Sequence, residues 1–145
     1  MPRLNNIHYL GGKDYKELPT YVAGWDVALI PFALNESTKF ISPTKTPEYL
    51  AAGRPVISAS IMDVVKPYGD EGLVHIADTA DEYIQAVEKI QALSKRERDA
   101  WLNKVDDFLK YNSWDNTWNK MHSHVVEVTE AKLSSKVKRA FKSVA

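Results

Sequence analysis

The chain contains no cysteine among its 145 residues, so it can form neither disulfide bonds nor thiolate metal sites. It also lacks any run of about eighteen apolar residues, so the sequence predicts no membrane-spanning helix. The first six residues contain no apolar core long enough for a signal peptide. These absences exclude a disulfide scaffold and a membrane span, and they fit a cytoplasmic setting without proving it.

A formal net charge of zero hides an uneven distribution of charge. The residues after Glu130 hold five bases and no acid, which are Lys132, Lys136, Lys138, Arg139 and Lys142. We therefore divide the chain into a body, 1–128, and a basic tail, 129–145. Three interpretations of the tail stay open: a solvated or disordered end, a helix packed on the body, and an amphipathic helix at an anionic membrane surface. The apolar stripe of such a helix is Leu133, Val137, Ala140 and Val144.

The hydrophobic pattern predicts an α/β fold. Short apolar runs typical of strands occupy residues 7–10, 27–32, 55–60 and 73–77, and helical patterns lie between and after them at 15–23, 45–52 and 62–65. Capping residues then predict three further helices, starting at Thr79, Ser94 and Ser113. Strands separated by helices indicate parallel pairing, so we expect a partial Rossmann-like sheet of about four strands with flanking helices and a helical C-terminal region.

The segment 42–58 combines a loop, a short helix, a glycine stop at Gly53 and a buried strand. Lys45 and Glu48 are three residues apart near the start of this helix, after the strand 27–32. Ligands of open α/β sheets sit at the carboxyl ends of strands, and a helix start attracts phosphate. Lys45 could bind a diphosphate and Glu48 a sugar diol. The alternative is an exposed pair of opposite charges that stabilises the helix by a few tenths of a kcal/mol, roughly.

The pattern P-x-K-x-x-E-Y-L-A-A-G-x-P-V-I, preceded by Asp26 and the apolar run 27–32, resembles the donor-binding half of a group 1 bacterial glycosyltransferase of the GT-B fold. The resemblance implies that Glu48 binds the nucleotide ribose and that Lys45 binds phosphate or sugar. It also implies a cytoplasmic enzyme of cell-surface polysaccharide synthesis, with a nucleoside-diphosphate sugar as donor and no cofactor. The donor-site residues that it selects are Ser42, Pro43, Thr44, Lys45, Glu48 and Tyr49.

One position departs from this family. Many members carry a second, sugar-contacting glutamate eight residues before the ribose-binding one, and here that position is Phe40. Glu36 is the nearest acid upstream and is out of register. Polar residues of the preceding loop are candidates for the sugar pocket, with a solvated loop as the alternative: Asn35, Ser37 and Thr38.

The resemblance also implies that the chain lacks the first two strand–helix units of the donor-binding half, together with the whole acceptor-binding half. The strand expected at 7–10 then lacks its usual neighbour, and exposed strand edges favour self-association. Catalytic residues stay unknown, and we expect this chain alone to be inactive. The alternative function is a non-catalytic Rossmann-like module that binds a nucleotide or a protein.

Other residues with reactive side chains favour structural roles. His75 lies within an expected strand, and His122 and His124 are two apart on a helix, so they face different directions and we expect no metal site. Trp101, Trp114 and Trp118 follow helical stripes, which is typical of a core or of an interface. The acidic body and the lack of a recognised module predict no nucleic-acid partner.

Overall fold

The computed structural model describes residues 2–142, with side chains as far as Ser134. The contacts within the chain divide it into two units, one ending at Asp106 and the other beginning at Asp107. The first unit contains the sheet, and the second unit is dominated by a single helix.

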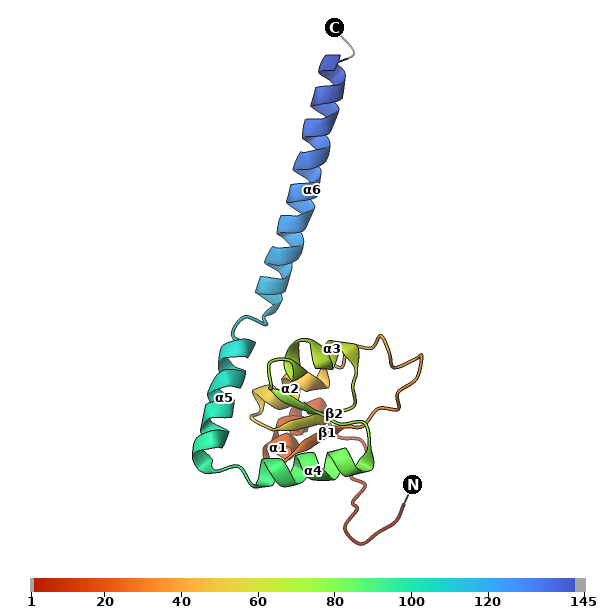
Figure 1. Ribbon diagram of the computed structural model, residues 1–145, viewed down its shortest axis with the longest axis vertical. Coiled ribbons are helices and arrows are strands. Elements are labelled where there is room, and N and C mark those ends of the chain that lie inside the picture. Colours follow the sequence, from red (N-terminus) through yellow and green to blue (C-terminus); the bar gives the residue numbers. More distant parts are fainter. Residues whose placement is uncertain (1, 143–145) are drawn as a thin grey trace. The chain divides into compact units, whose positions relative to one another are not determined.

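The sheet of the first unit has three parallel strands (Figure 1). They are β1 (Ala28–Ile30), β2 (Val56–Ser58) and β3 (Val74–Ile76), and they follow one another in the order β1-β2-β3. The register aligns Leu29 with Ile57 and Ile57 with His75. The predicted α/β class and the parallel pairing are therefore confirmed.

Helices cover both faces of this sheet. In Figure 1, α4 lies on one side of the strands, and α2 and α3 lie on the other. The helical elements of the first unit are η1 (Tyr15–Glu17), α1 (Leu18–Ala23), α2 (Lys45–Ala51), α3 (Met62–Val64), η2 (Val65–Gly69), α4 (Ala80–Gln91) and most of α5 (Lys95–Leu109).

The core is centred on β2, whose three residues are all buried. Ile57 packs with Ala77 and with Ile90 of α4, and partly buried side chains such as Tyr83 cover this cluster. Continuous burial is what a strand covered on both faces requires, and it explains the apolar run seen in the sequence. The strand therefore provides a rigid base for the loops at its carboxyl end.

The strand expected at residues 7–10 is not formed, so the prediction of a strand there was wrong. These residues have no regular structure, and the sheet has three strands instead of about four. A strand is stable only when its backbone groups bond to a neighbouring strand, and β1 bonds only to β2 among the described residues. No other strand of residues 2–142 pairs with the outer edge of β1, and Leu29 in this strand is half exposed. Self-association through this edge stays a prediction.

The helix ends follow the signals in the sequence. Gly53 has φ +69°, and the Gly53 and Arg54 N–H groups donate to the carbonyl oxygens of Leu50 and Tyr49. This is the two-bond glycine cap that ends many helices. At the start of α4, Thr79 and Glu82 form the predicted capping box. Backbone N–H donors at positions 78 and 79 hold the pKa of the Glu82 carboxyl below its usual value.

The second unit contains α6 (Trp114–Lys142), a helix of 29 residues. The predicted cap is confirmed, because Ser113 Oγ accepts a hydrogen bond of 3.1 Å from the Asn116 N–H. Leu133 of the expected tail stripe is exposed, whereas Val137, Ala140 and Val144 lie outside the described side chains. Within residues 2–142, no helix combines the length and the apolar character that crossing a membrane requires.

Candidate functional site

The predicted donor-site residues of α2 lie on one face of this helix. Lys45, Glu48, Tyr49 and Ala52 follow the spacing i, i+3, i+4, i+7, which aligns side chains along one side. All four line a hollow of about 350 Å³ opposite α1. The helix therefore contributes two exposed charged residues, Lys45 and Glu48, to the lining of the same hollow.

Aromatic and aliphatic side chains form the walls of this hollow. They come from η1, α1 and the segment before β1, and they are Tyr15, Leu18, Pro19, Val22 and Trp25. A pocket with apolar walls and a few polar groups at defined positions is the usual form of a small-molecule site. We call this cavity the α1–α2 hollow.

Trp25 and Tyr49, which both line this hollow, meet edge to face. Their ring centroids are 5.6 Å apart and their planes are inclined by 69°, a favoured geometry for aromatic pairs. Arg54 holds this corner, because its Nη1 donates to the Trp25 carbonyl oxygen at 2.6 Å and its Nε donates to the Ala52 carbonyl oxygen at 3.1 Å. The guanidinium thus ties the end of α2 to the segment that leads into β1.

Burial, with a smaller contribution from the neighbouring Glu48 carboxylate, raises the pKa of the Tyr49 phenol. The phenol therefore stays protonated at neutral pH and its hydroxyl can donate a hydrogen bond. Tyr49 also borders a second hollow of about 240 Å³, which it shares with Lys45 and residues 29–32. This second hollow brings Lys45 to the carboxyl end of β1, where the sequence predicted it.

The charges of Lys45 and Glu48 remain available to a ligand. Both residues are exposed, and the ion pairs among the described residues do not include one between them. The alternative of an exposed helix pair and the donor-site hypothesis both stay open at these two residues. Free charges of opposite sign on one face can contact different groups of one ligand.

The start of α2 offers fewer free backbone donors than the sequence suggested. Thr44 is the capping residue, but its side chain makes no capping hydrogen bond. The Thr46 N–H already donates to the Pro43 carbonyl oxygen at 3.1 Å. Pro47, the third residue of the helix, has no N–H. The strongest group for an anion at this helix start is therefore the Lys45 ammonium. Thr46 is fully buried, and its Oγ1 has no hydrogen-bond partner among the described residues.

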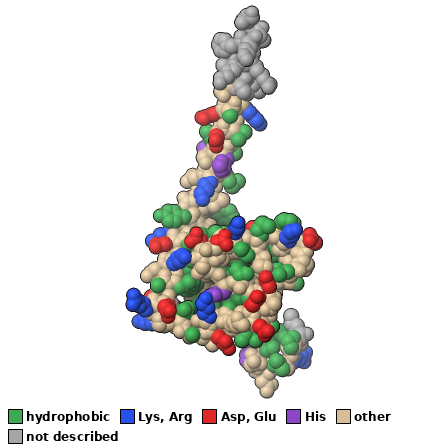
Figure 2. Space-filling model, in the orientation of Figure 1, with side chains coloured by type: hydrophobic (Ala, Val, Ile, Leu, Met, Phe, Trp, Pro, Cys, Tyr) green, Lys and Arg blue, Asp and Glu red, His purple; other side chains and the backbone are tan. Residues whose placement is uncertain are grey.

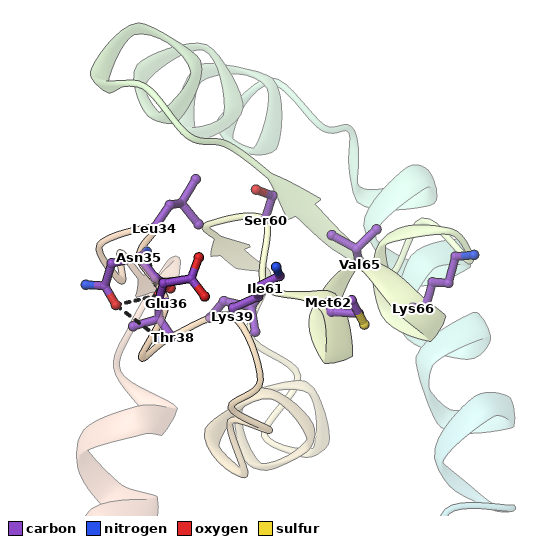
Figure 3. A pocket seen from close by; sticks show the side chains of 10 residues that line it. All are labelled: Leu34, Asn35, Glu36, Thr38, Lys39, Ser60, Ile61, Met62, Val65 and Lys66. Atoms are coloured by element: carbon purple, nitrogen blue, oxygen red, sulfur yellow. Dashed lines mark hydrogen bonds between the residues drawn. The ribbon is translucent and has the colours of Figure 1, made fainter.

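The loop between β1 and α2 borders a different cavity, of about 530 Å³ (Figure 3). Asn35 and Thr38 line it, together with Glu36 and with Ser60, which follows β2. The Asn35 carboxamide oxygen accepts hydrogen bonds from the N–H groups of Ser37 and Thr38, at 2.9 and 3.1 Å. Thr38 Oγ1 donates to the Ala33 carbonyl oxygen. These hydrogen bonds hold the loop in shape.

The structure therefore brings together only part of the predicted site. Lys45, Glu48 and Tyr49 share one hollow, and Asn35 and Thr38 line another. Neither of these cavities is lined by Ser37 or by the segment 42–44. Glu36, out of register in the sequence, reaches the loop cavity, whereas the Phe40 side chain is 74% exposed.

Sequence reasoning missed Trp25 and Arg54. Both act on the site through contacts with residues more than twenty positions away, at Tyr49 and Trp25 respectively. The signal that could have found Arg54 is its place directly after the glycine cap, where its side chain can reach back to the end of the helix. Trp25 follows a glycine and precedes Asp26, a context that indicates a strand start and nothing about a ligand.

His75 occupies the middle of β3 opposite Ile57. Burial, and to a smaller extent the nearby charge of Lys89, lowers the pKa of the imidazole, which is therefore neutral at pH 7. This environment agrees with the structural role that the sequence indicated. In the part of the chain that the structure describes, no three His, Asp or Glu side chains gather closely enough to hold a metal ion.

Comparison with known proteins gives one partial relative. This chain is 32% identical over 91 residues to a protein of Bacillus subtilis (strain 168). The name of that protein describes it as the teichuronic acid biosynthesis glycosyltransferase TuaH. The aligned region is 61% of this chain but only 22% of the relative, so the chain spans about a fifth of that protein. No family model matches the chain. No solved structure matches it either.

Proposed function

We propose that this chain is the donor-binding part of a glycosyltransferase that acts in cell-surface polysaccharide synthesis. The observation that carries the proposal is the placement of Lys45 and Glu48 on one face of α2, where both line the hollow that contains the Trp25–Tyr49 pair. The chemistry of these groups matches the parts of a nucleoside-diphosphate sugar: apolar rings, a diol and two phosphates. The likeness to a relative named for glycosyl transfer supports the same class of reaction.

Each residue takes a role from its chemistry. The Glu48 carboxylate accepts hydrogen bonds from the ribose hydroxyls, and such bonds to a charged acceptor are about twice as strong as neutral ones. The Lys45 ammonium faces the diphosphate, whose negative charge grows as the sugar leaves, so this contact stabilises the transition state. The walls of the α1–α2 hollow, with Trp25 and Tyr49, supply apolar surface for the base. The acceptor and any catalytic base belong to other parts of the enzyme.

Replacement of Lys45 by Gln should weaken the binding of a nucleoside diphosphate more than the binding of the matching nucleoside. The ammonium group interacts with the phosphates, and this attraction is screened by salt. Isothermal titration of the two ligands into the parent chain and the variant, at low and high salt, measures the difference. Lys95→Gln is a matched control, because Lys95 is exposed on α5 and does not line the α1–α2 hollow.

An equal loss of affinity for the two ligands would mean that Lys45 supports the fold, and the phosphate contact would then be removed from the proposal. Failure of the parent chain to bind any member of a panel of nucleoside-diphosphate sugars would favour the alternative, a Rossmann-like module that binds another partner. The titration therefore separates the proposed role from its main rival.

A further inference from the structure

The loop cavity, of about 530 Å³, lies where the chain leaves the carboxyl ends of β1 and β2. One side is formed by the loop that follows β1 and the other by the residues that follow β2 (Figure 3). Ligands of open α/β sheets bind outside the carboxyl ends of the strands, and small-molecule sites usually occupy about 300–1,000 Å³. The charged residues of α2 do not line this cavity, so it is distinct from the α1–α2 hollow.

Two side chains of opposite charge enter the loop cavity from the same loop. In Figure 3 the Glu36 carboxylate and the Lys39 ammonium extend toward the residues that follow β2. Both residues are exposed, and the ion pairs among the described residues involve neither of them. Lys39 Nζ lies 5.4 Å from the centroid of the Phe40 ring, a contact that takes none of its hydrogen bonds to a charged acceptor. Both charged groups are therefore available to a ligand.

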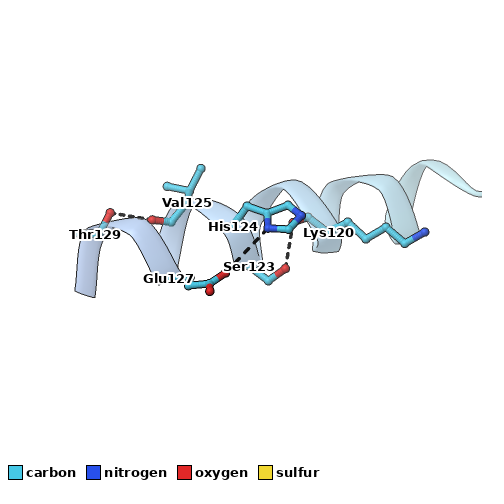
Figure 4. A network of polar contacts seen from close by, with 6 residues as sticks. All are labelled: Lys120, Ser123, His124, Val125, Glu127 and Thr129. Carbon is cyan, nitrogen blue, oxygen red and sulfur yellow. Dashed lines mark hydrogen bonds and ion pairs between the residues drawn. The ribbon is translucent and has the colours of Figure 1, made fainter. Parts of the chain in front are cut away.

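The backbone of the loop keeps these two charges apart. On α6, where residues three positions apart are neighbours, His124 lies 3.9 Å from Glu127 (Figure 4). Glu36 and Lys39 have the same spacing but lie in a turn instead of a helix. The Asn35 side chain fixes this turn through its hydrogen bonds to two backbone N–H groups. The turn therefore presents a carboxylate and an ammonium side by side without pairing them.

The chemistry of the two groups selects the class of ligand. A carboxylate only accepts hydrogen bonds, and an ammonium only donates them. The vicinal hydroxyl groups of a sugar both donate and accept, so one sugar ring can satisfy both side chains. An anion would be repelled by Glu36, and a cation would be repelled by Lys39. Figure 2 shows acidic and basic side chains interspersed over the visible face of the first unit, an arrangement that favours no ion of one sign.

The remaining walls of the loop cavity offer apolar surface. Leu34 is 54% exposed and Met62 is 56% exposed, and both line the cavity. Buried Ile61 and half-buried Val65 line it as well. A sugar ring has C–H groups on its faces, and apolar side chains gain free energy when such groups displace water from them. The cavity thus combines the polar and apolar contacts that a carbohydrate requires.

We propose that the loop cavity is a binding site for a neutral saccharide. The Glu36 carboxylate accepts hydrogen bonds from hydroxyl groups of the sugar, and the Lys39 ammonium donates to hydroxyl oxygens. Leu34 and Met62 cover the C–H groups of the ring. The ligand contains no nucleotide, so the proposal is independent of the donor site in the α1–α2 hollow.

Two lysines of the same cavity provide a matched test. Lys39→Gln removes the ammonium that extends across the cavity, whereas Lys66→Gln removes one that points away from the loop in Figure 3. Glu36→Gln removes the carboxylate charge at nearly unchanged size. All three residues are exposed, so we expect the variants to keep the fold. The dispersion of their ¹H–¹⁵N spectra verifies this.

Titration of the full ¹⁵N-labelled chain measures the outcome. The probes are three neutral trisaccharides (maltotriose, mannotriose and triacetylchitotriose), and inorganic phosphate is the anionic comparison. With at least one trisaccharide we expect saturable shifts of the backbone N–H signals of residues 34–39 and 60–66. Glu36→Gln and Lys39→Gln should each raise the dissociation constant roughly tenfold, through loss of a charged hydrogen-bonding group. Lys66→Gln should change it little.

Four results would overturn the proposal. The first is the absence of shifts with all three trisaccharides. The second is a shift of the same signals by phosphate and not by the trisaccharides, which would identify an anion site. The third is an equal effect of Lys39→Gln and Lys66→Gln, and the fourth is a response of the Trp25 indole in place of the loop signals. None of these results bears on nucleotide binding, because the probes contain no nucleotide.

Discussion

Replacement of Glu48 by alanine is expected to weaken binding of a nucleoside-diphosphate sugar by roughly 1–3 kcal/mol, a factor of about 5 to 150. Glu48 lines the α1–α2 hollow and is exposed, and the ion pairs among the described residues do not include one with Lys45. Its removal leaves the ribose hydroxyls without their charged acceptor. Isothermal titration of the parent chain and the variant with the same ligand gives the difference directly.

Glu88→Ala is the control for this experiment, because Glu88 is exposed on α4 and does not line the hollow. The Tyr49 phenol provides a second check. The Glu48 charge contributes to raising the pKa of that phenol, so Glu48→Ala should lower it toward its ordinary value. Unchanged affinity at unchanged fold stability would withdraw Glu48 from the donor site.

Leu50→Ala is expected to lower the free energy of unfolding by about 2–5 kcal/mol, through loss of buried apolar surface and the cavity that remains. Leu50 is 1% exposed and lies on α2 between the two charged site residues and Gly53. Chemical denaturation of the parent chain and the variant measures the change. Because α2 carries Lys45 and Glu48, the same substitution should also weaken ligand binding.

Leu29→Ala is the control for this second prediction, because it makes the same substitution at a position that is not buried. Leu29 is the same residue type, but it is 50% exposed and lies in β1, the end strand of the sheet. Its replacement should cost clearly less stability than that of Leu50. Equal costs at the two positions would mean that the packing of α2 on the sheet does not hold the site in place.

The sequence was sufficient for the parts of the fold that depend on local signals. Helix α2 begins at Lys45 as predicted and ends at the glycine cap, because Gly53 adopts the positive φ that other residues avoid. The buried strand at Val56–Ser58 followed from its apolar run. The prediction of a strand at residues 7–10 was wrong for a non-local reason. The apolar pattern of these residues is typical of a strand, but a strand also needs a neighbouring strand to pair with. A local sequence pattern does not show whether such a neighbour exists.

The features of the candidate site also divide into those that local sequence signals predict and those that depend on tertiary contacts. Helical spacing alone predicted that Lys45 and Glu48 share a face, and the structure places both at one hollow. The contact of Trp25 with Tyr49 joins the segment before β1 to α2, and no local sequence pattern predicts such a tertiary contact. The loop residues Asn35 and Thr38 were selected for their polarity, which their hydrogen bonds within the loop also explain.

The most direct test of the central claim uses the four tryptophans as reporters. Trp25 lines the α1–α2 hollow, the Trp101 indole donates to the Leu73 carbonyl oxygen at 3.2 Å, and Trp114 and Trp118 belong to α6. In a ¹H–¹⁵N spectrum of the labelled chain, each indole N–H gives its own signal. Titration with a nucleoside-diphosphate sugar should shift the Trp25 signal in a saturable way and leave the other three in place. A spectrum that does not change, or one in which only the tryptophans of α6 respond, would contradict a donor site in this hollow.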